Sequence, residues 1–137
     1  MTAVEKFLPL VGRILIALIF IRGGINKLCA IDGTIAQMSS HGIPLSNILV
    51  WGAIVLELGG GLMLIAGLLA RWVALALFFY TLVLALIFHA YWVMPEAQQR
   101  EQAASFFGHL SMMGGMLFVV AFGAGGFSLD GMIGRKT

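Results

Sequence analysis

Long apolar segments dominate the chain, and polar residues mark the joints between them. Four apolar runs cover residues 8–28, 46–69, 72–93 and 104–122. Each is close to the roughly 20 residues that cross a bilayer as a helix. Helix is the expected form, because every backbone polar group in lipid must be satisfied within its own segment. The pattern predicts an all-α fold, an integral membrane four-helix transmembrane bundle with up-down-up-down topology.

The polar joints agree with this division. The first joint, "AIDGTIAQMSSHGIPLSN", is rich in Asp, Gly, Ser and Pro, and is expected to be a loop. Pro44 disfavours helix just before it, and Ser46 or Asn47 can cap the second helix. Little more than Ala70-Arg71 joins the second and third runs, which predicts a tight antiparallel hairpin. His41 lies in the first joint and is interpreted as a solvated loop histidine.

Composition supports a small membrane protein. The chain has 137 residues, of which 61% are hydrophobic and 10% charged, and its mean hydropathy is +1.02. A soluble domain is nearer half apolar and a quarter charged. We expect one transmembrane domain over residues 1–137. Eight Lys and Arg spread along the chain do not form a nucleic-acid surface. The first run is expected to be retained, because Arg22 interrupts it and no A-x-A cleavage site follows.

Basic residues near the ends of the runs predict the orientation. One side of the bundle, shared by both termini, would hold Lys6, Arg13, Arg71, Arg135 and Lys136. The other side would hold Lys27 and Arg100, mixed with Asp32, Glu96 and Glu101. The positive-inside rule then places both termini in the cytoplasm. Arg13 lies close enough to its helix end for the guanidinium to reach the interface.

Polar residues inside the runs gather in the half of the bundle away from the termini, here called the outer half. At about 1.5 Å per residue, Arg22 lies roughly 9 Å and Glu57 roughly 15 Å below the outer ends of their helices. Asn26 is one turn above Arg22, and His89 and His109 lie about 6 and 7 Å deep. These five residues are the candidate pocket.

Arg22 and Glu57 are the expected ion pair. Ionisable groups at such depths face the bundle interior and pair, and the Arg fork suits a carboxylate. Small residues would let the two helices approach closely; they are Gly23, Gly24, Ala53, Gly60 and Gly61. Two interpretations stay open: the pair is purely structural, or it also lines a ligand pocket.

His89 and His109 are expected to be neighbours, and three interpretations compete. They hydrogen-bond across helices, or they line a quinone pocket in which imidazole exchanges a proton, or they ligate a haem or a metal. Met112 and Met113 suggest a soft metal such as copper(I), although methionines at this spacing are more typical of flexible packing. We predict no metal site, with haem ligation by the two histidines as the weaker alternative.

Several chemistries lack a sequence signal. Cys29 is the only cysteine, which excludes an intrachain disulfide or a C-x-x-C redox pair. The chain holds no Walker, dinucleotide-binding or H-E-x-x-H motif, and no nucleophile elbow. We assign no catalytic residue and do not expect the chain to be a catalyst on its own.

Four segments together resemble the DoxX family of small bacterial membrane proteins: "GRILIALIFIRGGINKL", "VLELGGGLMLIAGLLAR", "FHAYW" and "GFSLD". The resemblance implies a four-helix, multi-pass protein of the bacterial inner membrane. Some relatives are described as subunits of quinone-linked oxidoreductases. The residues at the family's recurrent positions are Gly12, Arg13, Asn26, Lys27, Glu57, Gly60, Arg71 and His89. Arg22 departs from the family pattern.

Two functions follow from these observations. In the first, the chain is an accessory or quinone-binding subunit of a membrane oxidoreductase, and partner subunits supply the electrons. In the second, it is a non-enzymatic membrane scaffold or a binder of a small hydrophobic molecule, and the Arg22–Glu57 pair is structural. No cofactor is firmly assigned, and a quinone is the candidate. The lipid bilayer is the expected surrounding, and assembly as a homo-oligomer is compatible with the apolar helix faces.

Overall fold

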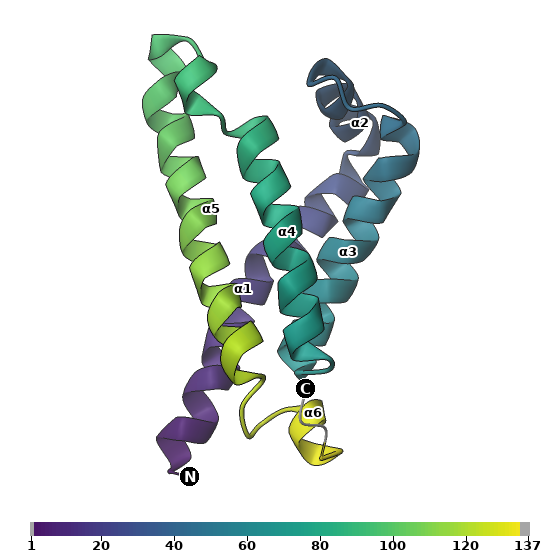
Figure 1. Cartoon of the computed structure of the whole chain (residues 1–137). Helices are drawn as coiled ribbons and strands as arrows, with labels where there is room; N and C mark the ends of the chain where they lie inside the picture. The colour runs from purple at the N-terminus through teal and green to yellow at the C-terminus, as the bar shows by residue number, and fades with distance from the viewer. Residues whose placement is uncertain (1, 135–137) are drawn as a thin grey trace.

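The computed structural model describes residues 2–134, which are helical with short connections (Figure 1). The elements, in chain order, are α1 (Ala3–Cys29), α2 (Ile31–Ser40), α3 (Ser46–Ala66), α4 (Ala70–Phe88), the 3-10 helix η1 (Tyr91–Val93), α5 (Glu96–Phe122) and α6 (Leu129–Met132). This described part contains no strand. The all-α prediction is confirmed.

The four long helices form two pairs, α1 with α3 and α4 with α5, and they alternate in direction along the chain (Figure 1). At the end where α1 begins, the pairs meet above α6. At the opposite end, which carries α2 and η1, the pairs diverge. This open end is the half of the bundle away from the termini, named the outer half above.

Within residues 2–134, three helical segments are long and apolar enough to cross a membrane: Ser46–Ala66, Ala70–Val93 and Glu96–Phe122. Their outward faces expose large apolar side chains, such as Val55 and Phe118, as expected for lipid contact. α1 has 27 residues, and its passage across the bilayer stays a prediction. The cytoplasmic placement of the termini also stays a prediction, and two of its charges, Arg135 and Lys136, lie outside the described residues.

The helices do not have the same limits as the predicted apolar runs. α5 begins at Glu96 directly after Pro95, not at residue 104, because the polar "EAQQREQ" segment is also helical. α4 ends at Phe88, where the backbone leaves the helix at His89 (φ −125°, ψ 27°), but the apolar candidate span continues through η1 to Val93, in agreement with the predicted run 72–93. α1 begins earlier than expected, since Thr2 and Glu5 form a capping box.

The first joint is not a loop. α2 occupies ten of its residues and buries none of them. The prediction that Ser46 or Asn47 caps α3 is wrong, because α3 already begins at Ser46. Leu45 precedes that helix in a left-handed conformation (φ 53°), and the Ser46 hydroxyl donates to Ile43 O at 2.8 Å. The joint therefore contains a separate helix, which lies at the outer end of the α1–α3 pair (Figure 1).

Arg13 is buried, so the prediction that it reaches the interface is wrong. The residue is 1% exposed, and its Nη1 donates to Leu64 O and Ile65 O, both at 2.9 Å. Its Nη2 donates to Phe127 O. The last carbonyls of a helix lack partners within it, and a cation there is favourable. Arg13 thus joins α1 to the end of α3 and to the C-terminal segment.

Asp130 fastens the same end from α6. Its Oδ1 and Oδ2 accept from the backbone N–H groups of Leu69 and Ala70, both at 2.9 Å, and its own N–H donates to Gly67 O. The carboxylate therefore satisfies free donors at the start of α4. Gly67 has φ +67°, a left-handed conformation that favours glycine and ends α3 here. Arg13 and Asp130 together close the inner end of the bundle.

Close packing of α1 on α3 depends on two glycines. A Cβ at Gly24 would lie 2.6 Å from Leu58 Cγ, and one at Gly61 would lie 2.8 Å from Ile21 Cγ1. The predicted close approach at these small residues is confirmed. It brings the outer part of α1 directly against the face of α3 that carries Glu57.

Replacing Asp130 with Asn tests the inner closure. An amide has one acceptor oxygen, so one of the two buried N–H groups loses its partner, and we expect unfolding to become easier by about 2 kcal/mol. The measurement is the apparent melting temperature in mild detergent. Asp32→Asn, on the exposed face of α2, is the matched control and should leave it unchanged. Equal melting temperatures for both variants would contradict the closure.

Candidate functional site

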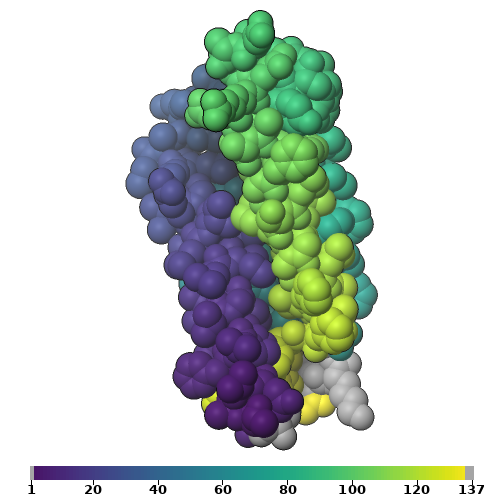
Figure 2. Space-filling model, turned by 90° about the vertical axis from the view of Figure 1, so that its left-hand side faces the viewer, coloured from purple at the N-terminus to yellow at the C-terminus, as the bar shows by residue number. Residues whose placement is uncertain are grey.

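A cavity of about 820 Å³ lies between the helix pairs in the outer half of the bundle. Its volume is within the range of small-molecule pockets. Figure 2 shows the surface hollowed between α1–α2, in purple to blue, and α5, in green. Most of the wall is apolar, and it includes Ile19, Phe20, Leu49, Leu56, Val83, Leu84, Ile87, Phe88, Met94 and Met112. The cavity suits a largely hydrophobic molecule.

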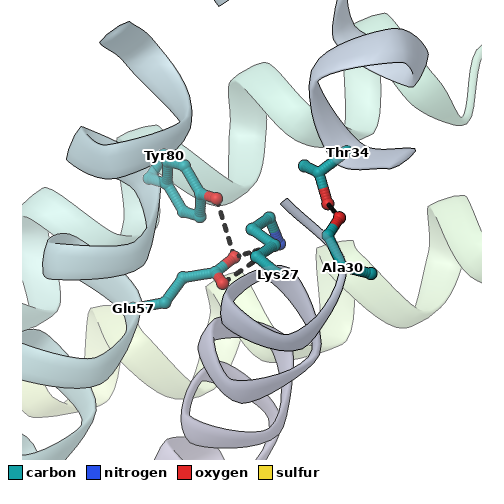
Figure 3. Close-up of polar contacts among 5 residues, drawn as sticks. All are labelled: Lys27, Ala30, Thr34, Glu57 and Tyr80. Atoms are coloured by element: carbon teal, nitrogen blue, oxygen red, sulfur yellow. Dashed lines mark hydrogen bonds and ion pairs between the residues drawn. The ribbon is translucent and has the colours of Figure 1, made fainter. Parts of the chain in front are cut away.

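One polar cluster in the wall consists of Lys27, Glu57 and Tyr80 (Figure 3). Lys27 Nζ lies 2.9 Å from Glu57 Oε1 and 3.0 Å from Oε2. The Tyr80 hydroxyl donates to Glu57 Oε1 at 2.7 Å. The Glu57 side chain is only 4% exposed, so water cannot solvate its charge. Lys27 and the Tyr80 hydroxyl stabilise the carboxylate instead. Three helices, α1, α3 and α4, meet at this carboxylate.

The predicted Arg22–Glu57 pair is wrong. Arg22 is exposed, and Lys27 occupies the carboxylate. The reason is helical phase, since each residue advances about 100° and Arg22 lies about 140° around the helix from Lys27. The buried stripe of α1 is Arg13, Ala17, Phe20 and Gly24. Lys27 continues this stripe three residues after Gly24. This spacing is the sequence signal that could have identified Lys27 as the partner of Glu57.

Gly23 allows the carboxylate to lie against the backbone of α1. A Cβ there would sit 3.0 Å from Glu57 Oε2. Asn26 is exposed and borders a second pocket of about 370 Å³ beside α2. Neither Arg22 nor Asn26 is among the residues that line the large cavity. Of the five candidate pocket residues, the structure brings together Glu57, His89 and His109.

A histidine pair forms the second polar cluster. The rings of His89 and His109 lie with centroids 4.7 Å apart and planes tilted by 43°, which confirms that the two residues are neighbours. His89 Nδ1 lies 2.8 Å from Gln102 Oε1, and His109 Nδ1 lies 2.7 Å from Ser105 O. Both histidines line the cavity. Of the described residues, no group of three or more His, Cys, Asp or Glu is placed to hold a metal ion.

His41 contributes to the cavity in a way that the sequence did not indicate. It is exposed, as expected, but it ends α2, and its ring lies 4.6 Å from that of Phe88 at the end of α4. Gln98 and Gln102 of α5 also line the cavity. The long polar start of α5 therefore places hydrogen-bonding groups around the outer opening.

The arrangement can orient a molecule that has an apolar body and a polar ring. Lys27 has three N–H donors, of which two point to Glu57, so one stays available to a ligand. The histidines offer ring nitrogens from α4 and α5. A ligand can thus be held between α1 and α5, the two helices that border the hollow in Figure 2.

A double-mutant cycle tests which cation forms the ion pair with Glu57. Removing one member of a buried pair leaves the other uncompensated, so Lys27→Met should destabilise the protein by about 3 kcal/mol. When Lys27→Met is combined with Glu57→Gln, the loss in free energy of unfolding should be smaller than the sum of the two single losses, and the coupling energy should be about 1–3 kcal/mol. Arg22→Gln with Glu57→Gln is the control and should be additive. Coupling to Arg22 instead of Lys27 would contradict the observed pair.

Comparison with known proteins places the chain in a family. The sequence pattern of the DoxX family matches residues 8–90, which include the cluster of Lys27, Glu57 and Tyr80 and also His89, whereas His109 lies beyond the matched region. The chain is 34% identical over 128 residues to inner membrane protein YphA of Escherichia coli (strain K12), covering 93% of this chain and 91% of YphA. It is 32% identical over 136 residues to inner membrane protein YqjF of the same organism, covering 99% of each chain.

No solved structure matches this chain. The family match covers more than half of the residues, and both relatives are aligned over nearly their whole length. The apolar helices agree with the membrane location that both relatives' names state. The chain belongs to the DoxX family and is an integral protein of the bacterial inner membrane.

Proposed function

We propose that this protein binds a quinone in the outer-half cavity and serves as an accessory subunit of a membrane oxidoreductase. The observation that carries the proposal is the cavity itself, which combines an apolar wall with two separate polar clusters. Lys27, Glu57 and Tyr80 form one cluster, and the His89–His109 pair forms the other.

A quinone fits both parts of this cavity. Its ring carries two carbonyl oxygens on opposite sides, each of which needs a hydrogen-bond donor when it leaves water. Lys27 can donate its free N–H to one oxygen, and a protonated imidazole can donate from Nε2 to the other, because Nδ1 of each histidine already donates to Gln102 Oε1 or Ser105 O. The isoprenoid tail would lie along the apolar wall and pass between α1 and α5 toward lipid, where Figure 2 shows the hollow.

The histidines of this chain can exchange protons with a quinone, whereas within residues 2–134 we identify no group that would carry electrons. Reduction of a quinone to a quinol takes up two electrons and two protons. Imidazole exchanges protons near neutral pH, and His89 and His109 line the cavity. Within residues 2–134 we identify no redox pair of cysteines, since Cys29 is the only one in the sequence. The proposal therefore assigns electron transfer to a partner subunit.

A second function is favoured by one specific observation. The Glu57 carboxylate accepts from both Lys27 and Tyr80 within the protein itself. This is what a purely structural cluster requires, because a buried charge must be paired and hydrogen-bonded. In that case the protein is a scaffold or a binder of an uncharged hydrophobic molecule, and the cluster fixes the register of α1, α3 and α4.

Mass spectrometry of an organic extract distinguishes the two functions. The protein is purified in mild detergent, with quinone added back, and its melting temperature is recorded for every variant. We expect about one quinone per chain, and a loss of at least 10-fold in occupancy in Glu57→Gln and His109→Ala, because the first removes the charge that holds Lys27 in place and the second removes an imidazole from the wall. Arg22→Gln, outside the cavity, is the control and should retain the quinone.

Phospholipid alone in the extract, from folded protein with quinone present, would contradict quinone binding. It would favour the scaffold function, in which Glu57→Gln lowers the melting temperature but changes no bound molecule.

A further inference from the structure

We propose that His89 and His109, together with the thioether of Met112, form a binding site for copper(I). The two rings lie 4.7 Å apart in the wall of the cavity, and Met112 lines the same cavity one turn beyond His109 on α5. The proposal rests on the spacing and the hydrogen bonds of these side chains and does not depend on quinone binding.

Both imidazoles form their hydrogen bonds through Nδ1, which leaves Nε2 of each ring available to bind a metal ion. Ser105 O is a carbonyl and can only accept, so His109 donates from Nδ1 and carries its lone pair on Nε2. Gln102 Oε1 likewise accepts from His89 Nδ1. Metal-binding histidines show this arrangement, in which a carbonyl holds the N–H of one ring nitrogen and the other nitrogen faces the ion.

The separation of the rings suits one shared ion. A metal about 2.0 Å from each ring nitrogen requires ring centroids within about 6 Å of each other. The observed 4.7 Å meets this limit, and the 43° tilt shows that the rings are not stacked in parallel. His89 directly follows the last residue of α4 and His109 lies within α5, so an ion would link the ends of these two elements.

The available ligands favour copper(I) over zinc. Structural zinc takes four ligands, chiefly Cys and His, whereas in the described part of the chain no third His, Cys, Asp or Glu joins this pair. Copper(I) is soft, accepts two or three ligands, and binds thioethers as well as imidazoles. Met112 is half-buried and supplies such a thioether, and Met94 lies in the same wall.

Competition for copper(I) against a chromogenic chelator tests the site. The full chain is purified without a polyhistidine tag, in a Cys29→Ser background because the exposed thiol would bind copper itself, and ascorbate keeps the copper reduced. We expect one copper(I) per chain. His89→Ala and His109→Ala should weaken binding by about 100-fold, and Gln102→Leu, which removes only the orienting acceptor, by about 10-fold.

Met112 and Met113 provide a matched pair. Met113 is buried and does not line the cavity. Met112→Leu should weaken copper(I) binding by about 10-fold, and Met113→Leu should leave it unchanged, because both substitutions conserve volume. This pair decides the matter if a histidine variant fails to fold.

Three results would overturn the site: no copper(I) bound to the Cys29→Ser chain, equal affinity in the two methionine variants, or zinc bound in preference to copper(I). Glu57→Gln separates this proposal from the quinone. It should lose quinone yet keep copper(I), since Glu57 contributes no ligand to the histidine pair.

Discussion

A charged side chain inside a bilayer must pair with other groups of the protein, because lipid chains offer no partner. The pairing of its charges determines how this helix bundle is organised. At the inner end, Arg13 donates to the last carbonyls of α3 and to the C-terminal segment, while Asp130 accepts from the first N–H groups of α4. Toward the outer end, Lys27 answers Glu57. The first set closes the bundle. The second stands in the wall of the cavity where the helix pairs diverge.

The two ends use different chemistry because they serve different purposes. Inner charges bind backbone groups that helix ends leave free, so they fasten α1, α3, α4 and the C-terminal segment in one arrangement. Outer polar groups bind one another and keep donors that face a hollow. A rigid closure beneath an open, partly polar cavity is a suitable frame for a ligand, because supporting contacts need not rearrange when the ligand enters.

Apolar run length was sufficient to predict helix and membrane location. It could not predict the helical start of α5 or the whole of α2, because both are polar and their helices are not needed to cross lipid. The neighbourhood of His89 and His109 was predictable from their depth. The partner of Glu57 was not, because depth places Arg22 and Lys27 alike in the outer half. Only the stripe through Ala17, Phe20 and Gly24 distinguishes them.

The structure of the protein in lipid nanodiscs with a quinone analogue tests the central claim most directly. The account predicts density for a ring in the outer-half cavity, in contact with Lys27 or Tyr80 on one side and with His89 or His109 on the other. It also predicts an inner end that is unchanged with and without the analogue. A cavity filled by lipid acyl chains at saturating analogue, or collapsed with α1 against α5, would contradict it.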